Sequence, residues 1–256
     1  METVSHYGRE TAYRHVERGG TGPGLCFVHG SGGDHRLWNG QYALADRYPI
    51  TTLDLSGHGE STDVDAAAGY PALSAYADDV VAVLEETGAR ILVGNSLGGA
   101  VVQHLLIERD PDVDAAVLAG TGARLGVLED LLRWLESDFE RAVEFLHQPD
   151  RLLHEPEPDV IERSMETMRA CGQAVTYRDF LTCHRFDVRD RLGEIDLPVL
   201  AVAGTYDRLT PLWFHEFLVE EIPVAELVEI DDAAHLSMVE QPEAFNEIVD
   251  GFVNDR

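Results

Sequence analysis

The chain has 256 residues, of which 45% are hydrophobic and 26% charged, so it is long enough to bury a large core and has an ordinary globular composition. Acidic residues number 47 against 19 basic residues, none of them lysine, and the net charge of −28 would repel nucleic-acid phosphates and anionic membrane surfaces. No apolar run approaches the roughly 20 residues that span a bilayer, so we expect neither nucleic acid nor a membrane as a partner.

Residues 1–122 alternate short β-rich runs with helical patterns, which is typical of a mostly parallel sheet covered by helices on both faces. Buried strands are predicted at residues 25–28, 50–53, 91–93 and 115–118. Helices are predicted at 73–86, where apolar residues form a stripe, and at 97–109, which is apolar enough to be buried. The fold class predicted from this rhythm is α/β.

Residues 123–193 break the alternation. Four charge-rich helical stretches are predicted there, interrupted by the sequence Glu155-Pro156-Glu157-Pro158. We interpret this segment as a helical cap inserted into a core domain made of residues 1–122 and 194–256, and we expect the core to fold without it. Strand and helix alternation then resumes, with strands at 199–203 and 224–230 and helices after Pro211 and at 242–253.

The sequence Gly94-Asn95-Ser96-Leu97-Gly98 fits the pattern G-x-S-x-G and lies between a predicted strand and a predicted helix. A sharp turn at such a junction lifts a serine hydroxyl out of the sheet, and glycines leave room for the close backbone contacts around it. Ser96 is therefore the candidate nucleophile, although a glycine-rich turn at this point is also a packing solution.

A serine hydroxyl needs a base to remove its proton, and the base needs an acid to fix its tautomer. Asp207 lies in the loop that follows the predicted strand 199–203, and His235 follows the strand that ends at residue 230. The order serine, acid, histidine predicts Asp207 as the acid and His235 as the base. Asp231 and Asp232 are competing acids, but we interpret them as turn residues because they precede His235 on its own loop.

His29-Gly30-Ser31-Gly32-Gly33 follows the first predicted core strand. An acyl-transfer reaction needs two N–H donors aimed at the developing oxyanion. We predict these donors to be the backbone N–H groups of Ser31 and Leu97, although the glycines also serve a tight turn. His29 and His58 are interpreted as residues that fix loops by hydrogen bonding.

Five segments in this order together resemble the α/β-hydrolase superfamily, in particular its compact capped esterases and C–C bond hydrolases. They are HGSGG at 29–33, DLSGHGES at 54–61, GNSLGG at 94–99, GTYDRLTP at 204–211 and DDAAHLSMVEQP at 231–242. The resemblance implies the α/β-hydrolase fold, with a mostly parallel central sheet, flanking helices and an inserted helical cap. It also implies the triad Ser96, Asp207 and His235. Relatives with dehalogenase or epoxide-hydrolase activity place an aspartate where this chain has Ser96.

Substrate specificity is expected to reside in the cap. Aromatic and sulfur-containing side chains there are candidates for a substrate pocket, although helix packing explains most of them equally well: Trp134, Phe139, Phe145, Phe180, Cys183 and Phe186. Arg124, Arg178 and Arg185 are candidates for binding a substrate carboxylate or for pairing with nearby acidic residues.

We expect a carboxylic-ester hydrolase that forms an acyl-enzyme on Ser96, acts on small or medium acyl esters as small-molecule substrates and needs no cofactor. One alternative is a C–C bond hydrolase or lyase that uses the same triad on a diketone or enol carboxylate, and Asn95 beside Ser96 favours it. A second is a ligand-binding protein that retains the fold, against which the complete triad argues.

The remaining features concern location and metals. Three cysteines without a CxxC pair predict neither a disulfide framework nor a zinc-thiolate site, and the eleven histidines show no HExxH pattern, so no metal is expected. Residues 1–6 have no basic start and no apolar stretch, so we expect no signal peptide and a cytoplasmic location. The absence of lysine together with abundant acid favours adaptation to a salt-rich cytoplasm over ordinary solubility. The sequence predicts no particular oligomeric state.

Overall fold

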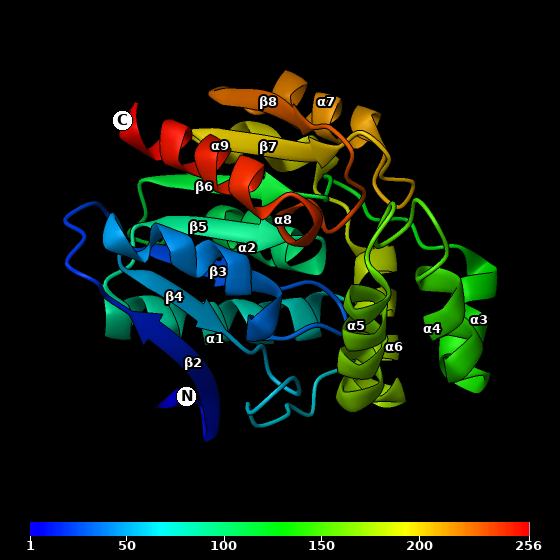
Figure 1. The fold of residues 1–256 in the computed structure, drawn as a ribbon. Coiled ribbons are helices and arrows are strands. Elements are labelled where there is room, and N and C mark those ends of the chain that lie inside the picture. Colours follow the sequence, from blue (N-terminus) through cyan, green and yellow to red (C-terminus); the bar gives the residue numbers. More distant parts are fainter. Residues whose placement is uncertain (256) are drawn as a thin grey trace.

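The computed structural model describes residues 1–255 and has one eight-stranded sheet with helices on both faces (Figure 1). The strands are β1 (Glu2–His6), β2 (Arg9–Val16), β3 (Leu25–Val28), β4 (Ile50–Leu53), β5 (Ile91–Asn95), β6 (Ala115–Ala119), β7 (Val199–Gly204) and β8 (Ala225–Ile230). Their spatial order is β1-β2-β4-β3-β5-β6-β7-β8. Strands β3 to β8 are parallel, and β2 is antiparallel to both β1 and β4. The predicted mostly parallel sheet is confirmed.

Every residue of β3, β4, β5, β6 and β7 is buried, because helices cover both faces of the central sheet. This explains why these strands are continuous apolar runs in the sequence. Strand β8 lies at an edge, and of its residues only Ile230 is buried. The β1–β2 hairpin was not predicted, because its polar side chains give it no apolar run.

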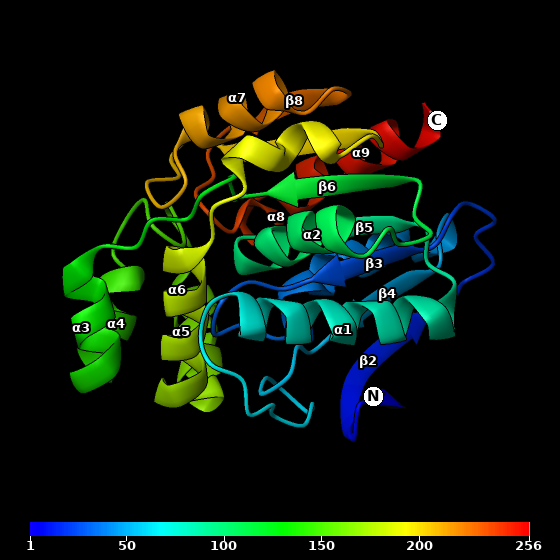
Figure 2. The same ribbon diagram turned by 180° about the vertical axis from the view of Figure 1, so that it is seen from behind.

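The helices that flank the sheet are α1 (Tyr70–Thr87), α2 (Leu97–Glu108), α7 (Leu212–Glu221), α8 (Ser237–Glu240) and α9 (Pro242–Asn254), with two 3₁₀ segments, η1 (His35–Asp46) and η2 (Arg189–Glu194). One face of the sheet packs against α1, α2, η2 and α7, and the other packs against η1, α8 and α9 (Figures 1 and 2). Each face has its own buried cluster of aliphatic and aromatic side chains. None of the helices within residues 1–255 combines the length and apolar character needed to cross a bilayer.

Four helices lie beyond the sheet, on the side toward which the parallel strands point (Figure 1). They are α3 (Glu129–Ser137), α4 (Phe139–Leu146), α5 (Pro158–Cys171) and α6 (Gln173–Arg185). They surround a third buried cluster that includes Leu135, Val143 and Leu146. Their position suits the cap proposed for residues 123–193, and we keep that division as a proposal.

The end of this segment packs with the main core. Cys183, Phe186, Val188 and Leu192 belong to the buried cluster formed with α1 and α2, and Phe186 is 1% exposed. The end of α6 and the peptide that follows it therefore pack in the main core on one face of the sheet. They also connect the cap to the core.

Candidate active site

Ser96 occupies a strained turn between β5 and α2. Its φ of 55° and ψ of −116° lie in a region that non-glycine residues rarely adopt. Two hydrogen bonds to the backbone of Ser96 hold the turn. The Ser96 N–H donates to the Ala119 carbonyl (3.0 Å), and the Ser96 carbonyl accepts from the Thr121 hydroxyl (2.9 Å). A side chain at Gly98 would lie 2.2 Å from the Val28 carbonyl oxygen, so the close approach of α2 to β3 requires glycine there.

Asp207 and His235 follow the carboxyl ends of β7 and β8, and both are buried. The Nδ1 atom of His235 lies 2.8 Å from Oδ2 of Asp207. Because the carboxylate accepts at Nδ1, Nε2 of His235 is left to act as the base. The two other acids considered from the sequence, Asp231 and Asp232, are exposed.

Three further donors fix the Asp207 carboxylate. The N–H groups of Leu209 and Thr210 donate to Oδ1 (2.7 and 2.9 Å), and the Thr210 hydroxyl donates to Oδ2 (2.7 Å). Burial alone would raise the pKa of Asp207, but the neighbouring His235 and the Thr210 bonds outweigh it and hold the pKa at about 2. Asp207 is therefore ionised across the physiological pH range.

One cavity is lined by Ser96, His235 and Ser31. Within residues 1–255 the Ser96 hydroxyl makes no hydrogen bond, and catalytic hydrogen bonds often tighten only when substrate binds. Asn95 links the turn that carries Ser96 to the loop that carries His235, because its side-chain amide donates to the carbonyls of Ala119 and His235 (both 3.2 Å). A Cβ at Gly120 would lie 2.9 Å from the His235 carbonyl oxygen, so the loop after β6 must leave room for the base.

The sequence did not identify three of these neighbours as functional. Asn95 was noted only for its place in the motif, and Thr210 is an ordinary residue two positions before a helix. His215, in α7, is buried, and its Nε2 accepts from the Thr121 N–H (3.2 Å). Burial lowers the pKa of His215 to about 4, so it is neutral beside the acid and base. The contacts of Asn95 with His235 and of His215 with Thr121 are set by tertiary packing, whereas those of Thr210 with Asp207 are local to one loop.

The two predicted oxyanion donors come from two different segments. Ser31 lines the cavity, in the loop after β3, and Leu97 is the first residue of α2. Among residues 1–255, neither of their backbone N–H groups donates a hydrogen bond to the protein. Two free N–H groups at a helix start and a glycine-rich turn are the arrangement that an oxyanion requires.

The cavity has a volume of about 830 Å³ and a mainly apolar lining that comes from both the core and the cap. Of the six cap side chains considered from the sequence, Phe145, Phe180 and Cys183 line it. Trp134, Phe139 and Phe186 are not among its lining residues: Trp134 packs against Phe145 in the cap, and Phe186 packs in the main core.

The arginines singled out from the sequence do not line this cavity. Arg178 binds the Tyr76 hydroxyl and Asp63, Arg185 donates to the carbonyl of Ala68, and Arg124 lies 3.9 Å from Asp187. Four other arginines do line it: Arg36, Arg151, Arg163 and Arg208. Within residues 1–255, Arg36, Arg163 and Arg208 are paired with aspartates, whereas Arg151 binds the Phe145 carbonyl and Gln148.

His29 and His58 are both fully buried and hydrogen bonded to the loops around them. Nδ1 of His29 is 2.8 Å from the Gly30 carbonyl, and its Nε2 accepts from the Leu55 N–H. Burial and the neighbouring His58 lower the pKa of His29 to about 4, so it is neutral. These contacts suit the interpretation that His29 fixes its loop.

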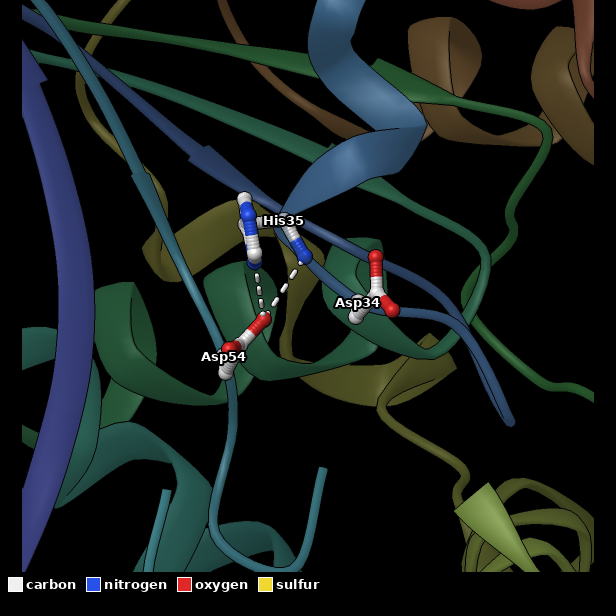
Figure 3. Close-up of side chains that lie close together, drawn as sticks. All are labelled: Asp34, His35 and Asp54. Atoms are coloured by element: carbon white, nitrogen blue, oxygen red, sulfur yellow. Dashed lines mark hydrogen bonds and ion pairs between the residues drawn. The ribbon is translucent and has the colours of Figure 1, made fainter. Parts of the chain in front are cut away.

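Asp34, His35 and Asp54 are close enough together to raise the question of a metal ion (Figure 3). Their donor atoms already have partners. Oδ1 of Asp54 accepts from both the backbone and the ring nitrogen of His35 (2.7 and 2.9 Å), and Asp34 pairs with Arg36. Asp34 therefore caps η1, and the contact between His35 and Asp54 joins their two loops. We assign no metal to this group.

Comparisons with known proteins agree with this fold. A model of the alpha/beta hydrolase family matches residues 27–248. The chain is 30% identical to the pimeloyl-(acyl-carrier protein) methyl ester esterase of Neisseria meningitidis serogroup C over 90% of this chain and 93% of that protein. It is 27% identical to 3-oxoadipate enol-lactonase 2 of Acinetobacter baylyi, over 89% and 87% of the two chains. The solved structure of a thermophilic esterase superposes with a TM-score of 0.87 at 30% identity and covers 99% of this chain and 97% of that one.

Proposed function

The chain belongs to the α/β-hydrolase family, and we propose that it is a carboxylic-ester hydrolase that works through an acyl-enzyme on Ser96. The observation that carries the proposal is the hydrogen-bonded pair of Asp207 and His235, which shares a cavity with Ser96 in its strained turn. The similarity to a methyl ester esterase, an enol-lactonase and a thermophilic esterase supports cleavage of an ester bond.

The reaction follows from the roles of these groups. Nε2 of His235 takes the proton of the Ser96 hydroxyl as its oxygen attacks the ester carbonyl carbon. The N–H groups of Ser31 and Leu97 stabilise the negative charge that develops on the carbonyl oxygen. The imidazolium, held by Asp207, returns its proton to the departing alkoxide, which leaves as an alcohol. Water then attacks the acyl-enzyme by the same steps, and the acid is released without any cofactor.

The cavity supports the choice of substrate. Its size and apolar lining suit a small or medium acyl group, and burial of that group would supply most of the binding energy. We propose a small molecule as the substrate and the cytoplasm as the site of action.

C–C bond cleavage of a diketone or enol carboxylate by the same triad is the second candidate. Arg151 favours it, because this arginine lines the cavity and has no carboxylate partner within residues 1–255. A substrate carboxylate would supply that partner. For such a substrate, Arg151→Gln would raise KM about 10-fold or more, whereas KM for a neutral ester would change little.

A fluorophosphonate probe tests the nucleophile. The wild type should be labelled at Ser96, and Ser96→Ala should lose both labelling and turnover of p-nitrophenyl esters while its circular dichroism stays unchanged.

Ser164→Ala is the matched control, because the Ser164 hydroxyl lies 2.9 Å from Nε2 of His147 and also lines the cavity. It should keep both labelling and turnover. Labelling that depends on Ser164 would overturn the assignment of Ser96. Turnover of a meta-cleavage product in preference to the esters would select the second candidate.

A further inference from the structure

We infer that Asp179, on cap helix α6, is a positioning residue that holds the oxyanion loop and so aims the Ser31 N–H at the reacting carbonyl; this inference rests on the proposed function. Oδ2 of Asp179 accepts a hydrogen bond from the N–H of Gly32 (3.1 Å), the residue next to Ser31. Asp179 lies far from Ser31 in the sequence and belongs to the segment that we propose as the cap. The cap would then contribute to catalysis as well as to substrate choice.

Asp179 is fully buried, and each of its other contacts is also with the core. Oδ2 lies 2.8 Å from Nε2 of His58, and Oδ1 accepts from the Tyr76 hydroxyl at 2.7 Å. Removing a carboxylate from water is costly unless its oxygens are well paired. Because the core supplies all these partners, the position of this carboxylate relative to the loop is closely defined.

The geometry of His58 makes it the cation of this pair. Its Nε2 faces the Asp179 carboxylate and its Nδ1 faces the Ser56 carbonyl at 3.2 Å, so both ring nitrogens meet acceptors and both carry protons. Burial would lower the pKa of His58, but Asp179 raises it well above the ordinary value. Two other titratable rings pack against it, and both are neutral: His29, whose pKa is lowered, and Tyr76, whose pKa is raised.

Helix α6 also contacts Ser31 itself. The Ser31 hydroxyl lies 3.7 Å from the Cys183 sulfur, one turn along the helix from Asp179. Gly32 has a φ of 66°, and a Cβ there would approach Met168 and Thr176 of the cap to 3.1 and 3.3 Å. The loop that presents the Ser31 N–H is therefore packed directly under α5 and α6.

The same helix has other ties to the core that do not touch the oxyanion loop. Arg178 binds Asp63 and the carbonyl of Val64, and the Thr182 hydroxyl accepts from the Gly69 N–H (2.9 Å). Thr182 is buried like Asp179 and lies three residues further along α6. It therefore provides a control for loss of a buried cap-to-core bond.

The experiment compares Asp179→Leu with Thr182→Val by kcat and KM for p-nitrophenyl butyrate and by affinity for phenylboronic acid, which imitates the tetrahedral intermediate. Asp179→Leu removes the acceptor of the Gly32 N–H. It should lower kcat about 10- to 100-fold with KM changed less than about 3-fold, because only the transition state uses the Ser31 donor. Affinity for the boronic acid should fall by a similar factor. Thr182→Val should leave both quantities within about 3-fold of the wild type.

A folded Asp179→Leu variant with wild-type kcat and boronic-acid affinity would overturn the inference, and so would an equal loss in Thr182→Val. If Asp179→Leu fails to fold, the double variant Asp179→Leu/His58→Leu replaces both charged groups by apolar side chains and avoids an unpaired buried cation. It should show the same loss of kcat, and wild-type activity in it would overturn the inference. Fluorophosphonate labelling of the wild type keeps the two proposals apart, since absence of labelling at Ser96 refutes the proposed function itself.

Discussion

The backbone N–H of His235 donates a hydrogen bond to the carbonyl of Arg151, with an N···O distance of 3.2 Å. Two similar bonds flank it, from Leu236 to the carbonyl of Leu152 (2.9 Å) and from Arg208 to that of Asp150 (3.0 Å). Residues 150–152, which lie between α4 and α5, therefore bridge the loops that carry the candidate base and acid. The segment proposed as a cap therefore contacts both loops of the candidate triad, and its Asp179 contacts the loop that carries Ser31.

The first prediction concerns removal of residues 123–193 in favour of a short Gly/Ser linker. The sequence led us to expect a core that folds without them, but the structure favours the opposite result. The deletion removes Phe186 and Leu192 from the main core, and a buried side chain of this size contributes about 2–5 kcal/mol. Against a total stability of about 5–15 kcal/mol, we expect no cooperative thermal transition by circular dichroism. A truncated chain that melts cooperatively and hydrolyses small esters would contradict this.

The second prediction concerns the acid. Asp207→Asn should lower kcat about 10³- to 10⁴-fold, because an amide at this position can fix the wrong tautomer of His235 and does not stabilise its charged form. Asp232→Asn is the matched control, since Asp232 is exposed and lies three residues before His235. It should change kcat less than about 3-fold. The reverse ranking in steady-state ester hydrolysis would show that the acid is misassigned.

The central strands and the three triad candidates could be predicted because their signals are local. A parallel strand buried on both faces is a continuous apolar run, and Ser96 and Asp207 each follow such a run. His235 follows the edge strand β8, which its β-rich sequence indicates. The β1–β2 hairpin gave no such signal. The contacts of Asn95 with His235 and of Asp179 with Gly32 depend on which loops the topology brings together. Phe186 shows the same limit, since an aromatic residue near a helix end looks alike whether it lines a pocket or packs in a core.

The third prediction concerns Asn95, whose side-chain amide joins the nucleophile turn to the base loop. Asn95→Ala leaves the carbonyls of Ala119 and His235 without this donor, which should cost about 1–3 kcal/mol of unfolding free energy. It should also lower kcat about 10-fold, because the position of His235 relative to Ser96 becomes less defined. Urea denaturation and steady-state kinetics measure the two effects. Unchanged kcat in a destabilised variant would limit Asn95 to a structural role.

The fourth prediction concerns the pH dependence of stability. Burial holds the pKa of His215 at about 4, below the value of about 6.5 in an unfolded chain. Below about pH 6.5 the unfolded chain therefore binds a proton that the native protein does not, and His215 destabilises the fold increasingly down to about pH 4. His215→Gln keeps an acceptor for the Thr121 N–H and does not titrate.

The unfolding free energy of His215→Gln relative to the wild type should therefore rise by about 1 kcal/mol or more between pH 7 and pH 4.5. Urea denaturation at constant salt measures it. Other buried histidines with a lowered pKa, such as His29, are present in both proteins. Their contribution therefore drops out of the difference in unfolding free energy. Parallel stability curves for the two proteins would refute the assignment of His215 as a buried neutral histidine.

The last prediction concerns salt. A net charge of −28 implies strong self-repulsion in the folded state, and the 19 basic residues are too few to offset the 47 acidic ones. Exposed ion pairs such as Arg90 with Asp114 weaken as salt rises, but each contributes only about 0–1 kcal/mol. Between about 0.1 M and 1 M salt the Debye length falls from roughly 10 Å to roughly 3 Å, so most of the repulsion is screened. The loss of repulsion should therefore outweigh the loss of pairing.

We therefore expect Tm to rise steeply with KCl and ester turnover to follow the folded fraction, because the 2.8 Å contact between Asp207 and His235 is too short to need molar salt. Sucrose at matched osmolality is the control, since it favours burial without screening charge. It should raise Tm much less than KCl does. Thermal unfolding by circular dichroism and hydrolysis of a p-nitrophenyl ester in the same buffers measure both quantities. A Tm that stays flat across the KCl series would refute adaptation to a salt-rich cytoplasm, and the acidic surface would then serve ordinary solubility.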